Sequence, residues 1–208
     1  MSTDAAAWQA QSLLLAYPDA GLPDRLDLVD LVAARLPEPV GAPLRRFVGH
    51  ARDTGAYGLA ADYVATFDHR KRCCLFLTYY AHGDTRKRGM ALLHLKQTYA
   101  AAGLRLSDEE LPDHLAVVLE YAAARPDDGR ALLLEHRAGL ELLRLALRDA
   151  HSPWADVLDS VSATLPPLAG DQRTAVARLA AQGPPAEQVG LAPFAPPEYM
   201  PQTQGAVR

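Results

Sequence analysis

The chain has 208 residues, 49% of them hydrophobic, so it can bury a sizeable core as a single domain. Its formal net charge of −4 argues against a dedicated nucleic-acid-binding protein, because such proteins usually carry a basic surface. Its two cysteines, Cys73 and Cys74, are adjacent; this excludes a disulfide framework and indicates a reduced, intracellular protein.

The sequence also argues against insertion into a membrane. No run of 18 or more apolar residues is present, so we expect no membrane-spanning helix. The first residues, MSTDAAAWQAQ, lack the basic start and apolar stretch of a signal peptide. We therefore expect a cytoplasmic protein.

Apolar residues recur at helical spacing along almost the whole chain. The first predicted helix spans about 5–16 and ends before Pro18, since proline cannot continue a helix. The second begins after Asp24, and we expect it to bury Leu28, Leu31 and Val32.

A third helix is predicted from the spacing of apolar residues between 43 and 51. Gly55 interrupts the pattern, and a fourth helix carries Tyr63 and Phe67. The apolar run 73–81 fits either a buried strand or a buried helix. We predict a helix, because no other segment offers a partner strand and a lone strand leaves its backbone unpaired.

The second half of the chain continues in the same way. A helix beginning at Asp84 or Thr85 is expected to end at Gly103, and a further helix follows the acidic segment 107–113. Residues 129–149 are predicted as one amphipathic helix whose polar face carries Arg137 and Glu141 as an exposed pair.

Two short helices are expected after residue 152, the last ending near 182. From residue 183 onward prolines are frequent and charges few, so 183–208 is predicted to be a flexible tail. The resulting prediction is an all-α fold with eight or nine helices, consisting of one domain, 1–182, and the tail.

Sequence signatures of catalysis are absent. The chain has no HExxH, GxSxG, P-loop or GxGxxG motif, so zinc hydrolases, serine nucleophiles and phosphate loops have no support. The cysteines lie in an apolar setting that favours inert thiols over redox chemistry. Basic clusters at 70–72 and 86–88 suggest a phosphate-binding face, but a solvated helix edge explains them better. The exposed tips and apolar faces of tyrosines favour a groove that binds a partner helix.

Several fragments of the sequence, in this order and spacing, resemble the NarJ assembly chaperones of respiratory nitrate reductase. The fragments are Leu14-Leu-Ala-Tyr17-Pro18-Asp19, Tyr63-Val-Ala-Thr-Phe67-Asp68-His-Arg70, Leu75-Phe-Leu-Thr-Tyr-Tyr80, His82-Gly83-Asp84-Thr85-Arg86-Lys-Arg88-Gly89 and Glu110-Leu111-Pro112-Asp113-His114-Leu115 with Leu119-Glu120-Tyr121. The resemblance covers roughly 10–180. The adjacent cysteines depart from the family, in which a small residue is common at that place.

This resemblance implies a TorD-like, all-helical domain without enzymatic activity. It implies binding to the N-terminal segment of the catalytic (alpha) subunit of nitrate reductase, and help in inserting molybdenum cofactor without binding that cofactor stably. From the motifs and the charge we expect no metal site and no nucleic-acid partner, and the oligomeric state stays open. The alternatives are a TorD-type chaperone for another molybdoenzyme, such as an S- or N-oxide reductase, and, far less favoured, a helical DNA-binding regulator.

The resemblance also suggests residues that contact the partner peptide. We expect the walls of the groove to be aromatic and its edge to be charged, with two carboxylates on the opposite side. The expected walls are Tyr63, Phe67, Tyr79 and Tyr80, the charged edge is Asp84, Arg86 and Arg88, and the opposite carboxylates are Asp113 and Glu120. For each of these side chains, packing or helix capping is an almost equally good explanation.

Overall fold

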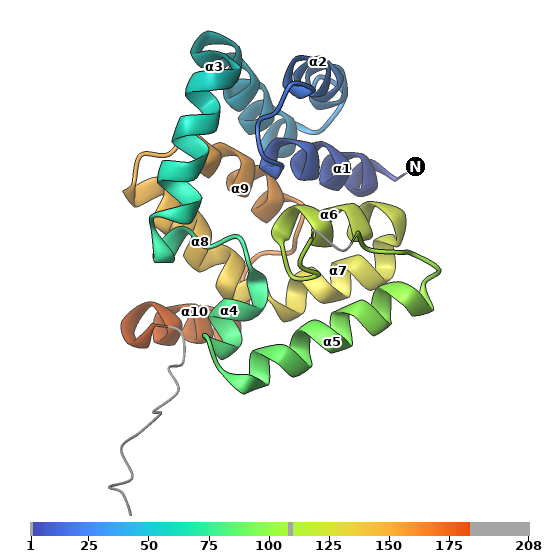
Figure 1. Ribbon diagram of the computed structural model, residues 1–208, viewed down its shortest axis with the longest axis vertical. Helices are drawn as coiled ribbons and strands as arrows, with labels where there is room; N and C mark the ends of the chain where they lie inside the picture. The colour runs from blue at the N-terminus through green and yellow to red at the C-terminus, as the bar shows by residue number, and fades with distance from the viewer. Residues whose placement is uncertain (1, 108–109, 184–208) are drawn as a thin grey trace, which may run out of the picture.

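The computed structural model describes residues 2–107 and 110–183. Within these residues it has ten α-helices and no strand beyond one isolated β-bridge (Figure 1). The all-α class is thus confirmed, with more helices than predicted. The expected domain boundary falls at the end of the last helix, and the predicted tail, apart from Gly183, lies outside the described residues.

The helices vary from one and a half to seven turns. They are α1 (Thr3–Leu15), α2 (Leu22–Ala33), α3 (Glu38–Tyr63), α4 (Leu77–His82), α5 (Arg86–Ala101), α6 (Leu115–Ala124), α7 (Pro126–Glu135), α8 (Arg137–Asp149), α9 (Trp154–Ala163) and α10 (Gly170–Gln182). A π-helical turn, Val64–Asp68, and a 3-10 turn, Lys71–Cys73, connect α3 to α4. No helix in the described part of the chain has the length and apolar character needed to cross a bilayer.

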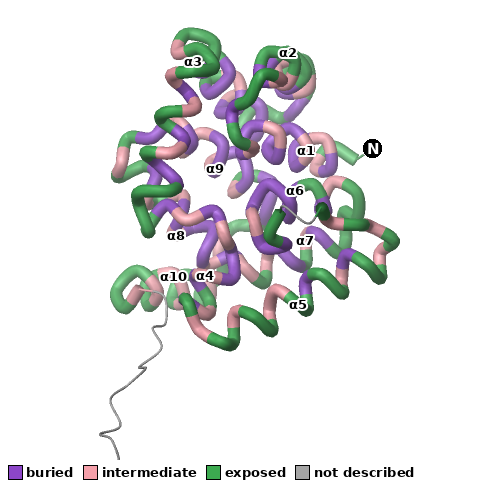
Figure 2. Tube along the Cα trace, in the orientation of Figure 1, coloured by how far each residue is buried: buried purple, intermediate pink, exposed green. Residues whose placement is uncertain are grey.

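The core lies where α1 and α9 meet. Trp8 and Trp154 are fully buried. The indole N–H of Trp8 donates to Thr164 Oγ1 at 2.9 Å, and the indole N–H of Trp154 donates to the carbonyl of Leu14 at 3.2 Å. Helices α2 and α6 pack against α1, while α3 and α8 pack against α9. Figure 2 shows that burial is concentrated here and is low along α5 and α10.

The buried face of α2 differs from the prediction. Leu28 and Leu31 are 51% and 62% exposed, whereas the buried side chains are Leu22, Leu26, Val29 and Ala33. The helix begins two residues before Asp24, at Leu22, and the i, i+4, i+7, i+11 series from that residue faces α1 and α3. The prediction was wrong for Leu28 and Leu31, because this helix carries apolar residues on two faces and the core takes the face with Leu26 and Val29. Val32, which was also predicted, is partly buried and packs against the core.

Helix α3 consists of two helical segments that meet at a kink at Gly55, whose φ of +75° and ψ of 163° are not helical. Only glycine adopts that conformation without strain, so the predicted interruption at this position is confirmed. Gly103, with φ +78°, likewise follows the end of α5, as predicted.

The prediction of one helix over 129–149 was wrong. The chain turns at His136 (φ −93°, ψ 14°), which divides the segment into α7, packed on α6, and α8, packed on α9 and α10. The turn brings Arg137 and Glu141 inside, where they are 4% and 2% exposed. They do form an ion pair, at 2.9 Å, but it is buried instead of solvated.

The helix predicted over 73–81 is present only in its second half. Cys74 and Phe76 have extended backbones, and Phe76 forms an isolated antiparallel bridge with His114. The amide of Leu77 donates to the carbonyl of Asp113, and the amide of Leu115 donates to the carbonyl of Leu75, both at 2.9 Å. The extended backbone therefore has a partner, in the segment that leads into α6.

Candidate functional site

The bridge between 74–77 and 113–115 places Asp113 beneath the first turn of α4. Its carboxylate is fully buried and accepts a hydrogen bond from Thr78 Oγ1 at 2.5 Å. Arg88, from the first turn of α5, approaches the same oxygen at 3.4 Å. Three elements that are separate in sequence are thereby joined through one carboxylate.

Arg88 is the cation that makes this burial tolerable. Its side chain is 19% exposed, lies 3.5 Å from Asp84, and stacks over the ring of Phe76 at 5.5 Å from the centroid. A buried carboxylate without a cationic partner would cost several kcal/mol, about 3–5 when one partner of a buried pair is removed. Asp113 and Arg88 therefore hold α4, α5 and the start of α6 in register.

His114 continues this junction at the N-terminus of α6. Its Nδ1 accepts a hydrogen bond from the amide of Ala116 at 3.3 Å, so the imidazole caps the helix in its neutral form. Burial lowers its pKa, and the nearby carboxylates of Asp113 and Glu110 oppose that shift without reversing it.

Two of the expected groove aromatics lie in the core. Tyr63 and Phe67 are 7% and 9% exposed, and both pack edge-on against Trp154 at 5.6 Å and 5.2 Å. The hydroxyl of Tyr63 donates to the carbonyl of Leu15 at 3.0 Å. These contacts join α3 to α1 and α9.

Tyr79 and Tyr80 lie on α4 and border a hollow of about 280 Å³ between α4, α8 and α10, which is called the second hollow to distinguish it from the cavity between α1 and α6. Tyr80 is 2% exposed, and its hydroxyl donates to the carbonyls of Cys74 (2.9 Å) and Arg72 (3.2 Å). Burial raises the pKa of Tyr80 far above its usual range, so this hydroxyl does not titrate near neutral pH. Tyr79 is half-buried and more accessible.

The charged residues expected at the edge of the groove are dispersed. Asp84 and Arg86 are exposed at the start of α5, whereas Arg88 and Asp113 form the junction described above. Glu120 is exposed on α6 and lines a different hollow. The structure thus brings Asp84, Arg88 and Asp113 together but places the aromatic side chains and Glu120 elsewhere.

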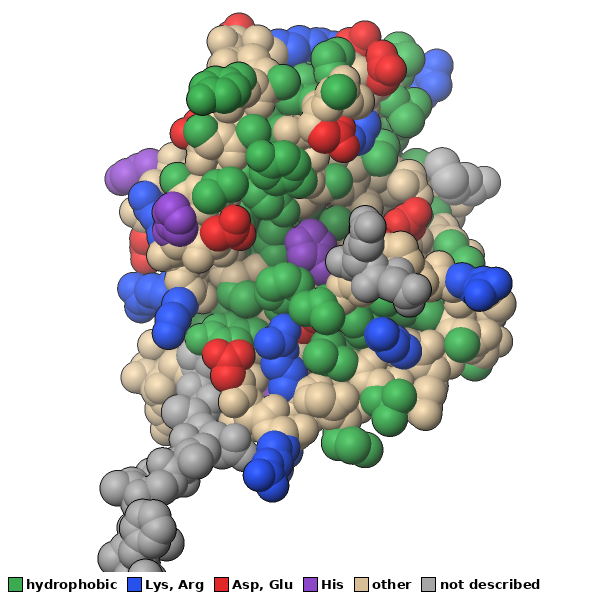
Figure 3. Space-filling model, viewed as in Figure 1, with side chains coloured by type: hydrophobic (Ala, Val, Ile, Leu, Met, Phe, Trp, Pro, Cys, Tyr) green, Lys and Arg blue, Asp and Glu red, His purple; other side chains and the backbone are tan. Residues whose placement is uncertain are grey.

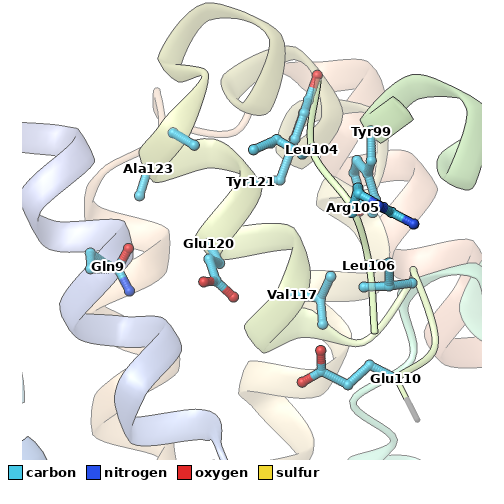
Figure 4. A pocket seen from close by; sticks show the side chains of 11 residues that line it. Gln9, Tyr99, Leu104, Arg105, Leu106, Glu110, Val117, Glu120, Tyr121 and Ala123 are labelled. Atoms are coloured by element: carbon cyan, nitrogen blue, oxygen red, sulfur yellow. The ribbon is translucent and has the colours of Figure 1, made fainter. Parts of the chain in front are cut away.

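The hollow that Glu120 lines is an open cavity of about 390 Å³ (Figure 4). It lies between α1, α6, the end of α5 and the segment that follows Gly103. Its lining residues are Gln9, Tyr99, Leu104, Arg105, Leu106, Glu110, Val117, Glu120, Tyr121, Ala123 and Ala124. In Figure 4, Gln9 and Glu120 point toward the same space from α1 and α6, and Leu106 faces Val117.

The apolar floor of this cavity is held rigidly. The rings of Tyr99 and Tyr121 lie 4.7 Å apart, and Tyr99 donates its hydroxyl to the carbonyl of Pro112 at 2.7 Å. Burial raises the pKa of both tyrosines, so they remain neutral and act as walls. Glu110, Glu120 and Arg105 are the charged residues among its lining, so two carboxylates face one guanidinium, and the cavity can take an apolar side chain and attract a neighbouring cation.

Sequence reasoning identified Glu120 but missed the rest of this cavity. The alternation Leu104-Arg105-Leu106 directly after a C-terminal glycine was the available signal, because two leucines in a connecting segment need an apolar surface. No group of three or more His, Cys, Asp or Glu side chains with metal-ligand geometry occurs among residues 2–107 and 110–183.

Comparison with known proteins gives a consistent set of similarities. The model of the family described as nitrate reductase delta subunit matches residues 33–159. The crystal structure of an Archaeoglobus fulgidus protein, described as a redox enzyme maturation protein, shares the fold with a TM-score of 0.55 at 19% identity, over 85% of this chain and 93% of that one.

Three relatives show the range of the sequence similarity. The nitrate reductase-like protein NarX of Mycobacterium tuberculosis is 38% identical over 76% of this chain, which spans only 24% of NarX. NarJ of Bacillus subtilis, named as a nitrate reductase molybdenum cofactor assembly chaperone, is 33% identical over 76% of this chain and 87% of its own length. NarJ of Escherichia coli, with the same name, is 34% identical over 71% of this chain and 64% of its own.

Proposed function

The chain belongs to the nitrate reductase delta subunit family, and on that premise we propose that it is a system-specific assembly chaperone for respiratory nitrate reductase. It binds the catalytic subunit before maturation and assists insertion of the molybdenum cofactor. The observation that carries this proposal is the 33% identity to the Bacillus subtilis chaperone, which extends over 87% of that protein.

The proposed activity is binding, not catalysis. The chain would act in the cytoplasm, hold the N-terminal segment of the catalytic subunit and release the enzyme once it is mature, without keeping the cofactor itself. The polar side chains of the junction around Asp113 support this proposal, because they are engaged in holding helices together.

We place the partner segment in the cavity between α1 and α6. Its volume of about 390 Å³ is in the range of binding pockets, about 300–1,000 Å³, and its floor is apolar. Burial of one leucine- or phenylalanine-sized side chain contributes about 1.5–3 kcal/mol. Glu110 and Glu120 at the mouth would select a segment with a basic residue beside that apolar anchor.

The other predicted residues then have two kinds of role. Tyr79, Asp84 and Arg86 are accessible and remain proposed contacts for a longer part of the partner. Their distance from the cavity along α4 and α5 means that they would act on a separate stretch of the partner chain. Glu120 alone of the nine predicted residues lies in the cavity itself.

Of the remaining five predicted residues, four are buried. We propose that they act through the fold and not by direct contact; they are Tyr63, Phe67, Tyr80 and Asp113. Arg88 belongs with them, because its guanidinium is committed to Asp113.

The test is calorimetric titration with a peptide that copies the first ~15 residues of the nitrate reductase catalytic subunit from the same organism, since an amphipathic helix of about four turns is long enough to fill a groove at ~1.5 Å rise per residue. We expect one-to-one binding with a negative heat-capacity change. Leu106→Ser should weaken it by about tenfold, which corresponds to about 1.4 kcal/mol. Leu145→Ser, in the second hollow and 40% exposed, is the matched control and should bind normally.

Each outcome of this titration decides between readings. Loss of binding in Leu145→Ser with normal binding in Leu106→Ser would move the site to the hollow between α4, α8 and α10. Binding only to a peptide from an S- or N-oxide reductase would reassign the partner enzyme. Absence of binding to every one of these peptides would contradict the proposal that the chain recognises such a segment.

A further inference from the structure

Helix α5 lies at the edge of the molecule and is held by few side chains. Only Leu95 and Tyr99, one turn apart, are buried, so the helix contributes a narrow inner face to the core. The opposite face is open to solvent: Met90 is 68% exposed and Leu93 is 49% exposed. Two large apolar side chains three residues apart on an exposed helix face form a small apolar patch.

The charge of this segment contrasts with that of the chain. Between residues 85 and 107 five residues are Lys or Arg and none is Asp or Glu, although the chain as a whole carries −4. Arg86, Lys87, Lys96 and Arg105 are exposed. Figure 3 shows basic and hydrophobic side chains side by side along the lower edge of the molecule, where α5 runs.

Helix geometry sets the arrangement of these side chains. With about 100° between successive residues, Met90 and Leu93 lie about 60° apart, and Arg86 falls between them. Lys87 and Lys96 lie about 90° to either side of that centre. The outer face thus carries two apolar side chains on either side of an arginine, with a lysine on each flank, and the long basic side chains can reach polar headgroups while Met90 and Leu93 face acyl chains.

The acidic groups nearest to α5 lie beside this face and not on it. Asp84 is engaged by Arg88 at 3.5 Å. Asp128 and Glu135 line a hollow between α5 and α7. The positive charge of the outer face therefore acts at short range, within about 10 Å at moderate salt, despite the acidic balance of the chain.

We propose that the outer face of α5 docks on an anionic lipid surface. Met90 and Leu93 enter the interface, and Arg86, Lys87 and Lys96 meet lipid phosphates. A lipid surface fits better than an acidic protein, because the patch is convex and its basic groups lie on both flanks of protruding apolar side chains. This contact is peripheral and reversible. It leaves the cavity proposed for the partner peptide free, and it shares Arg86 with the surface proposed for a longer part of the partner.

The experiment is sedimentation of the whole chain with phosphatidylcholine vesicles that contain or lack phosphatidylglycerol, at low and high salt. We expect binding only with the anionic lipid, and loss at high salt. Each basic group near such a surface contributes about fivefold, so Lys87→Gln/Lys96→Gln should weaken partitioning about 25-fold. Met90→Ser/Leu93→Ser should weaken it about tenfold.

The chain supplies a matched control on α2. Leu28 and Leu31 have the same spacing and similar exposure, 51% and 62%, but lie among Asp24, Asp27 and Asp30. Leu28→Ser/Leu31→Ser should therefore leave vesicle binding unchanged. No binding to anionic vesicles at low salt, or binding that only the α2 variant abolishes, would overturn the proposal.

Discussion

The ion pair between Arg137 and Glu141 offers a sharp quantitative prediction. Glu141 Oε1 forms an ion pair with Arg137 Nη2 at 2.9 Å and accepts a hydrogen bond from Ser162 Oγ at 2.7 Å, and Oε2 accepts one from Arg144 Nε at 2.7 Å. The side chains of Arg137 and Glu141 are 5% and 3% exposed. Burial lowers the pKa of Arg137, which reflects the cost of holding its charge away from water.

Glu141→Ala removes the carboxylate and leaves the guanidinium of Arg137 buried beside Ser162 alone. Breaking a buried pair in this way costs about 3–5 kcal/mol, whereas an exposed i, i+4 pair contributes about 0.2–0.5 kcal/mol. We therefore expect the free energy of unfolding, measured by urea titration followed by circular dichroism, to fall by about 3 kcal/mol or more. The dependence of this free energy on urea concentration should stay unchanged.

Two further variants separate burial from general damage. Arg137→Met/Glu141→Leu replaces the pair by apolar groups of similar size and should return stability to within about 1 kcal/mol of the original chain. Asp27→Ala breaks the exposed contact with Arg52 and should leave the free energy of unfolding nearly unchanged. A loss below about 1 kcal/mol for Glu141→Ala would refute the reasoning, because it is the value for a solvated pair.

Three other predictions follow from single positions. Gly129→Ala should lower the free energy of unfolding by roughly 3 kcal/mol or more, because the added Cβ would come within 2.2 Å of Ala122 Cα. Gly49→Ala, which has open space around it, should instead stabilise α3 by about 0.5–1 kcal/mol. Urea unfolding of the two variants measures both effects. Burial lowers the pKa of His114 in the folded chain. As pH falls below about 6.5, the ordinary pKa of histidine, the unfolded chain binds a proton on this imidazole before the folded chain does, so the free energy of unfolding decreases until pH reaches the folded pKa. His114→Asn, which can still cap α6, should show a smaller decrease when urea unfolding is repeated over this pH range. Tyr80→Phe removes a buried hydroxyl that satisfies two carbonyls and should cost about 1–3 kcal/mol in thermal or urea unfolding.

Local patterns predicted most of the helices but not which side of each is buried. Gly55 and Gly103 marked the positions where predicted helices are interrupted or end, and both have φ above zero. For α2 the spacing of apolar residues failed, because they occupy two faces of the helix and spacing alone does not distinguish the buried face with Val29 from the exposed face with Leu28.

The larger errors came from contacts between distant segments. Cys74–Phe76 is extended because it pairs with residues near His114, more than thirty positions later, and no local signal carries that pairing. The turn at His136 is likewise set by α7 and α8 packing on different neighbours. Periodicity alone cannot distinguish one long helix from two that change direction.

The candidate site was the least predictable part. Aromatic residues near sequence positions 63–80 suggested a groove, but Tyr63 and Phe67 were needed in the core around Trp154. The cavity instead uses Leu104 and Leu106 from a connecting segment, which have no helical periodicity. Their contribution depends on how α1 and α6 are packed, and that is a property of the whole fold.

The measurement closest to the central claim is the molybdenum content of nitrate reductase catalytic subunit purified from the host with and without this chain. We predict that the subunit lacks molybdenum when the chain is deleted, that the original chain restores it, and that Leu106→Ser restores it less well than Leu145→Ser. A fully loaded catalytic subunit in the absence of the chain would contradict its role as an assembly chaperone.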